Sequence, residues 1–233
     1  MAGGKSPATW GPGYHFGMST PYVRPDLPET MTWEELERLP EEIAAQIELW
    51  EGHVVWARRG PGEHQMFTRR LTNSLERSAR KDMSDRTEHC WIANLETNVF
   101  FGQTGKSDFM TPDFLVHRCL GAPYQDVRAD DVVLVGEVLS PSNSVSEIEA
   151  KRARYAGGGI PWYWEVELAR DDSAIDTVRA FALETRSGQL PDGVRALHRA
   201  NYILVGEWTH ADENGVEIVH PFPISIPWSE LEF

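Results

Sequence analysis

The longest hydrophobic run in the chain covers residues 132–139, where a single acid, Glu137, interrupts Val, Leu and Gly. An almost unbroken apolar run of this length is typical of a central strand that is buried on both faces. Two shorter apolar runs flank Glu51-Gly52 within residues 47–56, and this pattern predicts a β-hairpin. The chain is therefore expected to build its core around a sheet.

Helical spacing is clearest at Phe67, Leu71 and Leu75, which predict a helix over residues 63–81. Other helices are predicted at residues 147–155, ended by the glycines at 157–159, and after a capping box at 32–35, ending near Pro40 or Ile43. Further strands are predicted at 94–101, 113–116, 160–166, 178–183, 200–205 and 216–219. These elements predict one α/β domain with a mixed sheet.

The segment before this domain differs in composition. Residues 1–30 are rich in Gly and Pro and show no hydrophobic periodicity, so we expect a flexible N-terminal arm in front of a single domain over residues 31–233. Residues 1–25 also lack the apolar core of a secretion signal, and no stretch approaches the roughly 18 apolar residues of a membrane span. We therefore expect a cytoplasmic protein, in which Cys90 and Cys119 would be buried thiols.

The net charge of −14 argues against attraction of nucleic acid by the overall field of the protein. The charge is uneven, however. Residues 26–51 hold nine acids and one base, whereas residues 58–81 hold seven bases and two acids. A local basic face over residues 58–81 is therefore one interpretation, and an ordinary solvated helix face is the other.

Two acids lie where an acid is costly. Glu137 interrupts the run that is expected to be buried, and a buried carboxylate costs several kcal/mol unless it is protonated, paired or bound to a metal. Asp113 begins another short apolar strand. If the two strands are neighbours, their carboxylates converge on a point that suits Mg²⁺ or Mn²⁺. Lys151, one helix further along, could reach the same point and stabilise charge on a phosphate.

Several segments occur in an order that resembles a known family. They are residues 47–52 (Ile-Glu-Leu-Trp-Glu-Gly), 111–116 (Thr-Pro-Asp-Phe-Leu-Val), 136–142 (Gly-Glu-Val-Leu-Ser-Pro-Ser) and 151–164, with flanking matches at 31–36 and 221–231. Together they resemble the Uma-two family of bacterial restriction-endonuclease-like proteins over residues 31–233. The resemblance implies the fold of PD-(D/E)XK nucleases: an α/β, restriction-endonuclease-like mixed central sheet flanked by helices.

The resemblance also implies a metal-dependent endonuclease that hydrolyses phosphodiester bonds of nucleic acid, DNA above all, and that acts as a homodimer. Asp113 would be the acid of the Pro-Asp motif, Glu137 the second acid and Glu48 an additional upstream acid, so that these three would hold Mg²⁺ or Mn²⁺. Leu139 stands where many such nucleases have lysine, and Lys151 from the next helix would replace it as the catalytic lysine.

Other interpretations stay open for these residues. Glu48 could be a solvent-facing hairpin residue, and Lys151 could be a surface lysine that pairs with Glu147 at the i, i+4 spacing. His64 matches a histidine often found at the start of the following helix, either in the site or as a structural residue. Glu147 and Glu167 stand where the family commonly has Asp.

A second function is compatible with the same residues. The chain could keep the nuclease fold and its acids but act as a catalytically weak or inactive module that binds a protein or small-molecule partner. The negative net charge favours this alternative. A basic groove beside Asp113 and Glu137 would favour catalysis on nucleic acid, and an acidic rim would favour another partner.

Overall fold

The computed structural model describes residues 24–57, 60–141, 143–170, 173–184 and 200–232. Most of the expected N-terminal arm, residues 1–23, lies outside the described residues. The rest of that segment lies along the first hairpin, where Thr30 bridges His53 and Glu29 O accepts a hydrogen bond from Val54 N. No helix in the described ranges is long and apolar enough to cross a membrane.

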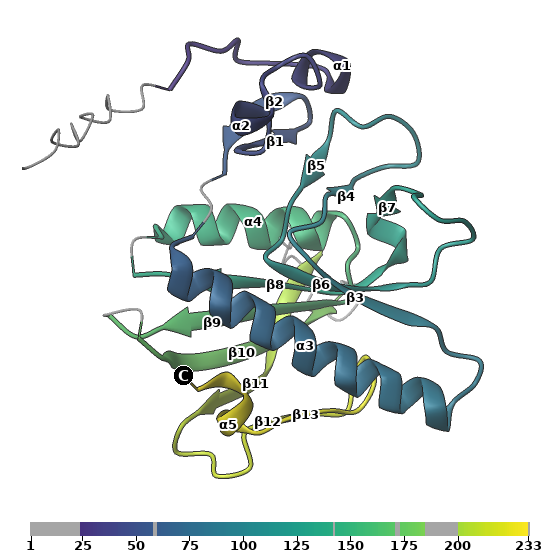
Figure 1. Cartoon of the computed structure of the whole chain (residues 1–233), viewed down its shortest axis with the longest axis vertical. Helices are drawn as coiled ribbons and strands as arrows, with labels where there is room; N and C mark the ends of the chain where they lie inside the picture. Colours follow the sequence, from purple (N-terminus) through teal and green to yellow (C-terminus); the bar gives the residue numbers. More distant parts are fainter. Residues whose placement is uncertain (1–23, 58–59, 142, 171–172, 185–199, 233) are drawn as a thin grey trace, which may run out of the picture.

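A six-stranded sheet forms the centre of the molecule (Figure 1). Its strands, in the order β11-β10-β9-β8-β6-β3, are β11 (Asn201–Thr209), β10 (Ile175–Glu184), β9 (Trp162–Leu168), β8 (Val132–Leu139), β6 (Phe114–Arg118) and β3 (Trp91–Leu95). Strands β8 and β9 run parallel and the other neighbours run antiparallel, so the sheet is mixed. Every residue of β8 is buried, as its apolar run predicts.

Two helices cover opposite faces of this sheet. Helix α3 (Gly62–Asp85) carries the predicted apolar line and packs against the face that includes Phe114. Helix α4 (Val145–Gly157) places Tyr155 in the hydrophobic cluster that includes Leu115 on the other face. A Cβ at Gly136 would lie 1.9 Å from the Phe114 ring, so only glycine lets that ring cross β8. The central sheet therefore presents alternate residues of β8 to two different helices.

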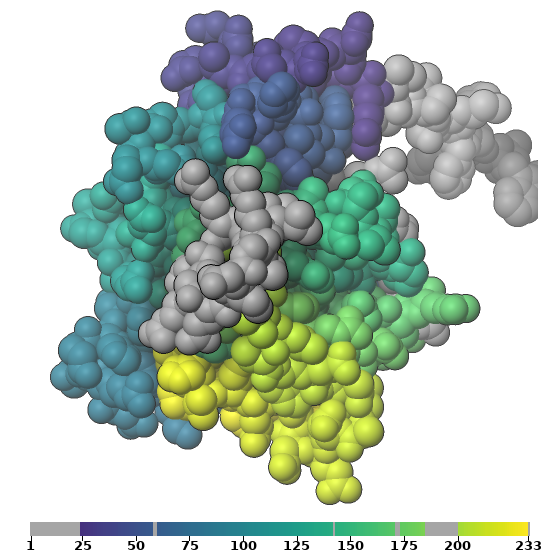
Figure 2. Space-filling model, turned by 180° about the vertical axis from the view of Figure 1, so that it is seen from behind, coloured from purple at the N-terminus to yellow at the C-terminus, as the bar shows by residue number. Residues whose placement is uncertain are grey.

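A smaller sheet lies at the N-terminal end. Its strands, in the order β2-β1-β5-β4-β7, are β2 (His53–Trp56), β1 (Ile47–Trp50), β5 (Phe109–Met110), β4 (Val99–Phe100) and β7 (Val127–Arg128). Helices α1 (Trp33–Leu36) and α2 (Glu41–Ala44) lie beside it, and the 3-10 helix η1 (Ala129–Asp131) follows β7. The C-terminal segment adds β12 (Val216–Ile218), β13 (Ile224–Ile226) and α5 (Trp228–Leu231). Figure 2 shows this segment, in yellow, at the opposite end of the molecule from the purple N-terminal elements.

Two predicted elements are each divided in the structure. Residues 94–101 form the end of β3 and, after a break, β4 in the other sheet, because Glu96 adopts a left-handed backbone with φ of 42°. The single acidic helix is two short helices, α1 and α2, and Pro40 is the N-cap of the second. Proline fits the start of a helix but breaks its interior, which explains the division.

The prediction of two buried thiols was wrong. Cys90 and Cys119 form a disulfide, and both residues are exposed. Cys90 precedes β3 and Cys119 follows β6, and the antiparallel pair Trp91–Arg118 places the two Cα atoms 5.3 Å apart. That separation suits a disulfide. Strand register produces the bond, and register is not visible in the spacing of two cysteines.

Candidate active site

Glu137 lies in the middle of the sheet and faces α4. Its side chain is 4% exposed, and both carboxylate oxygens accept hydrogen bonds. Lys151 Nζ donates to Oε2 at 2.7 Å, and the Tyr155 hydroxyl donates to Oε1 at 2.5 Å. Lys151 and Tyr155 are one helical turn apart on α4, so a single face of this helix supplies both donors. Lys151 is thus held at Glu137 and is not a freely solvated surface lysine.

Asp113 reaches the same region from the start of β6. The pairing of Phe114 with Gly136 aligns this residue with the end of β8, where Asp113 Oδ2 accepts a hydrogen bond from Val138 N at 2.7 Å. His64 Nε2 lies 3.2 Å from the same oxygen and 3.0 Å from Val138 O. Because both neighbours are acceptors, Nε2 carries the hydrogen. His64 therefore orients Asp113 from the first turn of α3.

Glu48 comes to the site from the smaller sheet. It is 1% exposed, which excludes the solvent-facing alternative. Trp50 Nε1 donates to Oε2 at 2.8 Å, and Thr111 N donates to Oε1 at 2.9 Å. The second bond ties Glu48 to the segment that leads into Asp113. The structure thus brings together Glu48 of β1, Asp113 just before β6, Glu137 of β8 and Lys151 of α4.

The charges in this cluster are not balanced. Burial raises the pKa of Glu137 to about 7, Lys151 opposes this shift, and the neighbouring Asp113 carboxylate adds to it. Burial would lower the pKa of Lys151, but Glu137, Glu48 and Asp113 together raise it well above the ordinary lysine value. Burial likewise lowers the pKa of His64, yet the hydrogen bond and charge of Asp113 outweigh it, so this pKa is raised. Three acids therefore surround one lysine.

The donor chemistry of the cluster fits a hard divalent cation in part. Asp113 and Glu137 repel one another, and a cation between like charges relieves that repulsion. Both hydrogen-bonding contacts of Asp113 use Oδ2, and Oδ1 has no hydrogen-bond partner among the described residues. The oxygens of Glu48 and of Glu137 are all engaged in hydrogen bonds, so Oδ1 of Asp113 is the one carboxylate oxygen of these three acids without a partner among the described residues. Within the described ranges no three Asp, Glu, His or Cys residues form a ready-made ligand set.

The sequence analysis missed one residue of the site, Tyr155, and one buried acid beside it, Glu165. Tyr155 stood in a matching motif without a role, and its i+4 spacing from Lys151 was the available sign. Glu165 of β9 was not considered, although it is a second acid in an apolar strand. It is 3% exposed, and it is the register partner of Glu137.

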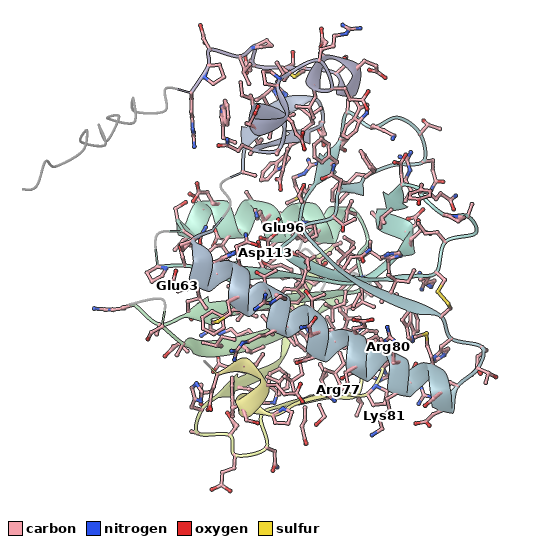
Figure 3. The ribbon with its side chains drawn as sticks, in the orientation of Figure 1. Glu63, Arg77, Arg80, Lys81, Glu96 and Asp113 are labelled. Atoms are coloured by element: carbon pink, nitrogen blue, oxygen red, sulfur yellow. A yellow bond between two sulfur atoms is a disulfide. The ribbon has the colours of Figure 1, made fainter. Side chains whose placement is uncertain are left out.

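The surface beside the site carries both signs of charge. Figure 3 shows Glu63, Glu96 and Asp113 near the N-terminal end of α3, and Arg77, Arg80 and Lys81 towards its other end. Arg77 pairs with Glu230 at 2.8 Å, and Arg80 pairs with Glu76 at 2.5 Å. Part of the basic charge on α3 is therefore neutralised by its neighbours.

Comparison with known proteins agrees with this architecture. Residues 33–193 match the Uma2 family, described as "Putative restriction endonuclease". Among solved structures, the chain is similar to "a putative nuclease belonging to DUF820 from Anabaena variabilis ATCC 29413", with a TM-score of 0.52 and 16% identity over 86% of this chain and 97% of that chain. A search of curated proteins gave no match.

The two matches carry different weight. At 16% identity the likeness to the solved structure shows the fold alone, and it confirms the expected restriction-endonuclease-like mixed sheet flanked by helices. The family match covers more than half of the chain and includes Glu48, Asp113, Glu137 and Lys151. The resemblance seen in the sequence motifs is thereby confirmed, and the chain belongs to the Uma2 (Uma-two) family of restriction-endonuclease-like proteins.

Proposed function

We propose that this protein is a divalent-metal-dependent endonuclease that hydrolyses phosphodiester bonds of nucleic acid, with DNA as its substrate. The observation that carries the proposal is the meeting of Asp113, Glu137 and Lys151 at the end of β8, where the two acids are close enough to raise a pKa. Membership of a family described as restriction endonucleases supports the same chemistry.

Each residue has a distinct role in this proposal. Asp113 and Glu137 would hold Mg²⁺ or Mn²⁺, and Glu48 would add negative charge and fix the segment before Asp113. When bound, such an ion polarises a phosphoryl oxygen and activates an attacking water. Lys151, with a side chain 28% exposed, would neutralise the charge that develops on the phosphate. His64 keeps the Asp113 carboxylate in place.

Residues 31–233 would form a single nuclease-like domain that follows an N-terminal arm of residues 1–30. The nucleic acid would bind to this domain. The exposed bases of α3, among them Arg69 and Lys81, offer phosphate contacts beyond the site. Because two of their neighbours on α3, Arg77 and Arg80, form ion pairs, we expect this contribution to be modest and strongly weakened by salt.

A homodimer is also part of the proposal, and the outer edge of β11 supports it. No described strand pairs with that edge, and Ile203, Leu204 and Val205 along it are each about half exposed, at 49%, 50% and 49%. An antiparallel two-fold pairing centred on Leu204 would set Ile203 against Val205, so apolar groups would meet without like charges. Light scattering should give a dimer at micromolar concentration and a monomer for Leu204→Lys; a monomeric wild-type protein contradicts it.

The alternative is a nuclease-fold module with little turnover that binds a protein or small molecule. The acids Glu63 and Glu96 near Asp113 favour it, since they disfavour the approach of a phosphate backbone. The net charge of −14 acts in the same direction.

A cleavage assay separates the two functions. Supercoiled plasmid, single-stranded DNA and RNA are incubated with the protein in Mg²⁺ or Mn²⁺, with EDTA and the Asp113→Asn variant as controls. The proposed function predicts cleavage of plasmid that both controls abolish. A folded, metal-binding protein that cleaves none of the three substrates would instead support the binding module.

A further inference from the structure

Glu165 is a buried acid that the proposed reaction does not use. It faces α4 from β9 and lies beside Glu137 in the parallel register of β8 and β9. Arg152 is its partner: Nη2 lies 2.6 Å and Nε lies 3.1 Å from Glu165 Oε1. The Glu165 side chain is 4% exposed and that of Arg152 is 35% exposed. The acid is thus embedded in the sheet, and the arginine reaches it from the rim of α4.

Consecutive residues of α4 therefore bind acids on consecutive strands. Lys151 binds Glu137 on β8, and Arg152 binds Glu165 on β9. Neighbouring strands are about 4.8 Å apart, whereas one residue advances a helix by about 1.5 Å and turns it by about 100°. One contact leaves a helix free to roll or slide over a sheet, but two contacts on different strands oppose both movements. The Arg152 guanidinium also lies 4.8 Å from the centre of the Phe181 ring of β10, which extends the anchor to a third strand.

A contribution to stability alone does not explain this pair. Removing a glutamate and most of an arginine from water costs free energy that their attraction often fails to recover, and apolar replacements are frequently as stable. The arrangement does give α4 a defined rotation and register on the sheet, which an apolar contact specifies less sharply. Geometry is thus the property that the pair supplies.

We propose that the Arg152–Glu165 pair is a positioning element that fixes α4 on the sheet so that the Lys151 ammonium is held at Glu137. The proposal rests on the proposed function only for the catalytic role of Lys151. Neither Arg152 nor Glu165 touches the substrate.

Amine labelling tests the position of Lys151 directly, without any substrate. The chain has four lysines, Lys5, Lys81, Lys106 and Lys151, so labelled peptides are easily distinguished by mass spectrometry. Exposed Lys81 on α3 is the internal reference. In Glu165→Gln and in Arg152→Gln, the labelling rate of Lys151 relative to that of Lys81 should rise about tenfold over wild type. A loss of about 1.4 kcal/mol in the free energy that keeps the ammonium at Glu137 raises the population of released lysine tenfold.

A matched control separates positioning from simple weakening of the helix. Ala153 is the exposed neighbour of the pair on α4, and Ala153→Gly destabilises the helix without touching either ion pair. Its relative Lys151 labelling should stay within about twofold of wild type. If either single variant fails to fold, the double variant Arg152→Met/Glu165→Met leaves no unpaired buried charge, and it should show the same tenfold rise with stability retained.

The outcomes distinguish this inference from the proposed function. In an active protein, Glu165→Gln should lower kcat about tenfold and leave KM unchanged, because the substitution displaces Lys151 and leaves the binding of substrate unaffected. If wild type cleaves nothing, the proposed function fails while the labelling still decides the positioning. Unchanged Lys151 labelling in the pair variants, or an equal rise in Ala153→Gly, overturns the inference.

Discussion

Two buried acids in different parts of the core, Asp82 near the end of α3 and Glu137 on β8, differ in how their charge is compensated. Asp82 lies near the end of α3 and accepts hydrogen bonds from His89 Nδ1 at 2.6 Å and from Trp91 Nε1 at 2.8 Å. Burial alone would raise its pKa, but these bonds and the nearby Arg86 outweigh it, and the pKa is lowered. Asp82 is therefore a satisfied anion that ties the end of α3 to β3.

Glu137 has good hydrogen-bond partners too, yet the balance is reversed. Burial raises its pKa to about 7, and neither Lys151 nor Tyr155 cancels the effect. Asp113 contributes a second negative charge at the same place. An acid whose burial is fully compensated holds the fold together, whereas an acid whose charge is left in excess is ready for a cation or a proton. The difference in compensation, and not burial as such, marks the candidate site.

The largest effect we expect is on catalysis. Lys151→Met should lower kcat for plasmid cleavage by about 10²-fold or more, because a preorganised charge next to the reacting phosphate is lost. Asp82→Asn should leave kcat within about twofold at a temperature where it stays folded. Comparable losses in both variants would show that the surroundings of Glu137 and of Asp82 do not differ as described.

The free energy of unfolding should show the opposite order. Asp82→Asn leaves His89 and Trp91 with a weaker acceptor and should cost about 1 kcal/mol, the low end of the usual range because His89 and Arg86 are partly exposed to screening solvent. Glu137→Gln removes an unfavourable charge and keeps an acceptor for Tyr155, and Asp113 and Glu48 still compensate the Lys151 ammonium that loses its partner, so stability should change by less than this. Urea denaturation at pH 7 measures both; a larger cost for Glu137→Gln would reverse the comparison.

Acid sensitivity sharpens the assignment of Asp82. Its pKa is lower in the folded protein than the unfolded value of about 3.9, so its stabilising contribution is present above that value and is lost as the pH falls through the folded-state pKa. The stability difference between wild type and Asp82→Asn should thus shrink as the pH falls below about 4. Chemical denaturation across that range tests it, and a difference that grows on acidification would argue against the assignment.

The smallest effect belongs to an acid on the surface. Glu76 pairs with Arg80 at 2.5 Å on the solvent side of α3, and their side chains are 45% and 73% exposed. Removing such a pair with Arg80→Ala should change stability by less than about 0.5 kcal/mol. If Arg80→Ala lowered the free energy of unfolding as much as Asp82→Asn does, the buried hydrogen bonds of Asp82 would not distinguish it from the exposed acid Glu76.

The sequence predicted most of the fold because hydrophobic periodicity is a local property. The central strand at 132–139 is observed with the predicted bounds, and the helix predicted over 63–81 is observed as Gly62–Asp85. The hairpin at 47–56 is also present, with Glu51 and Gly52 at positive φ. The strand at 94–101 failed because its two halves enter different sheets, and a turn at Glu96 leaves no mark in an apolar pattern.

The site was predictable only where the acids themselves were unusual. Glu137 was conspicuous because it interrupts an apolar run, and Asp113 because it follows a proline at a strand start. The neighbour relation of Glu137 and Glu165, and the disulfide of Cys90 with Cys119, depend on strand register. Register is fixed by packing between distant segments and so lies beyond a local pattern.

Manganese binding is the measurement that tests the central claim most directly. Mn²⁺ affinity is determined by calorimetry or electron paramagnetic resonance for wild type, Asp113→Asn and Asp82→Asn. The account predicts one site in wild type, the same affinity in Asp82→Asn, and a loss of about tenfold or more in Asp113→Asn, since one carboxylate ligand is removed from a pair. Unchanged affinity in Asp113→Asn would contradict a metal centre at the end of β8.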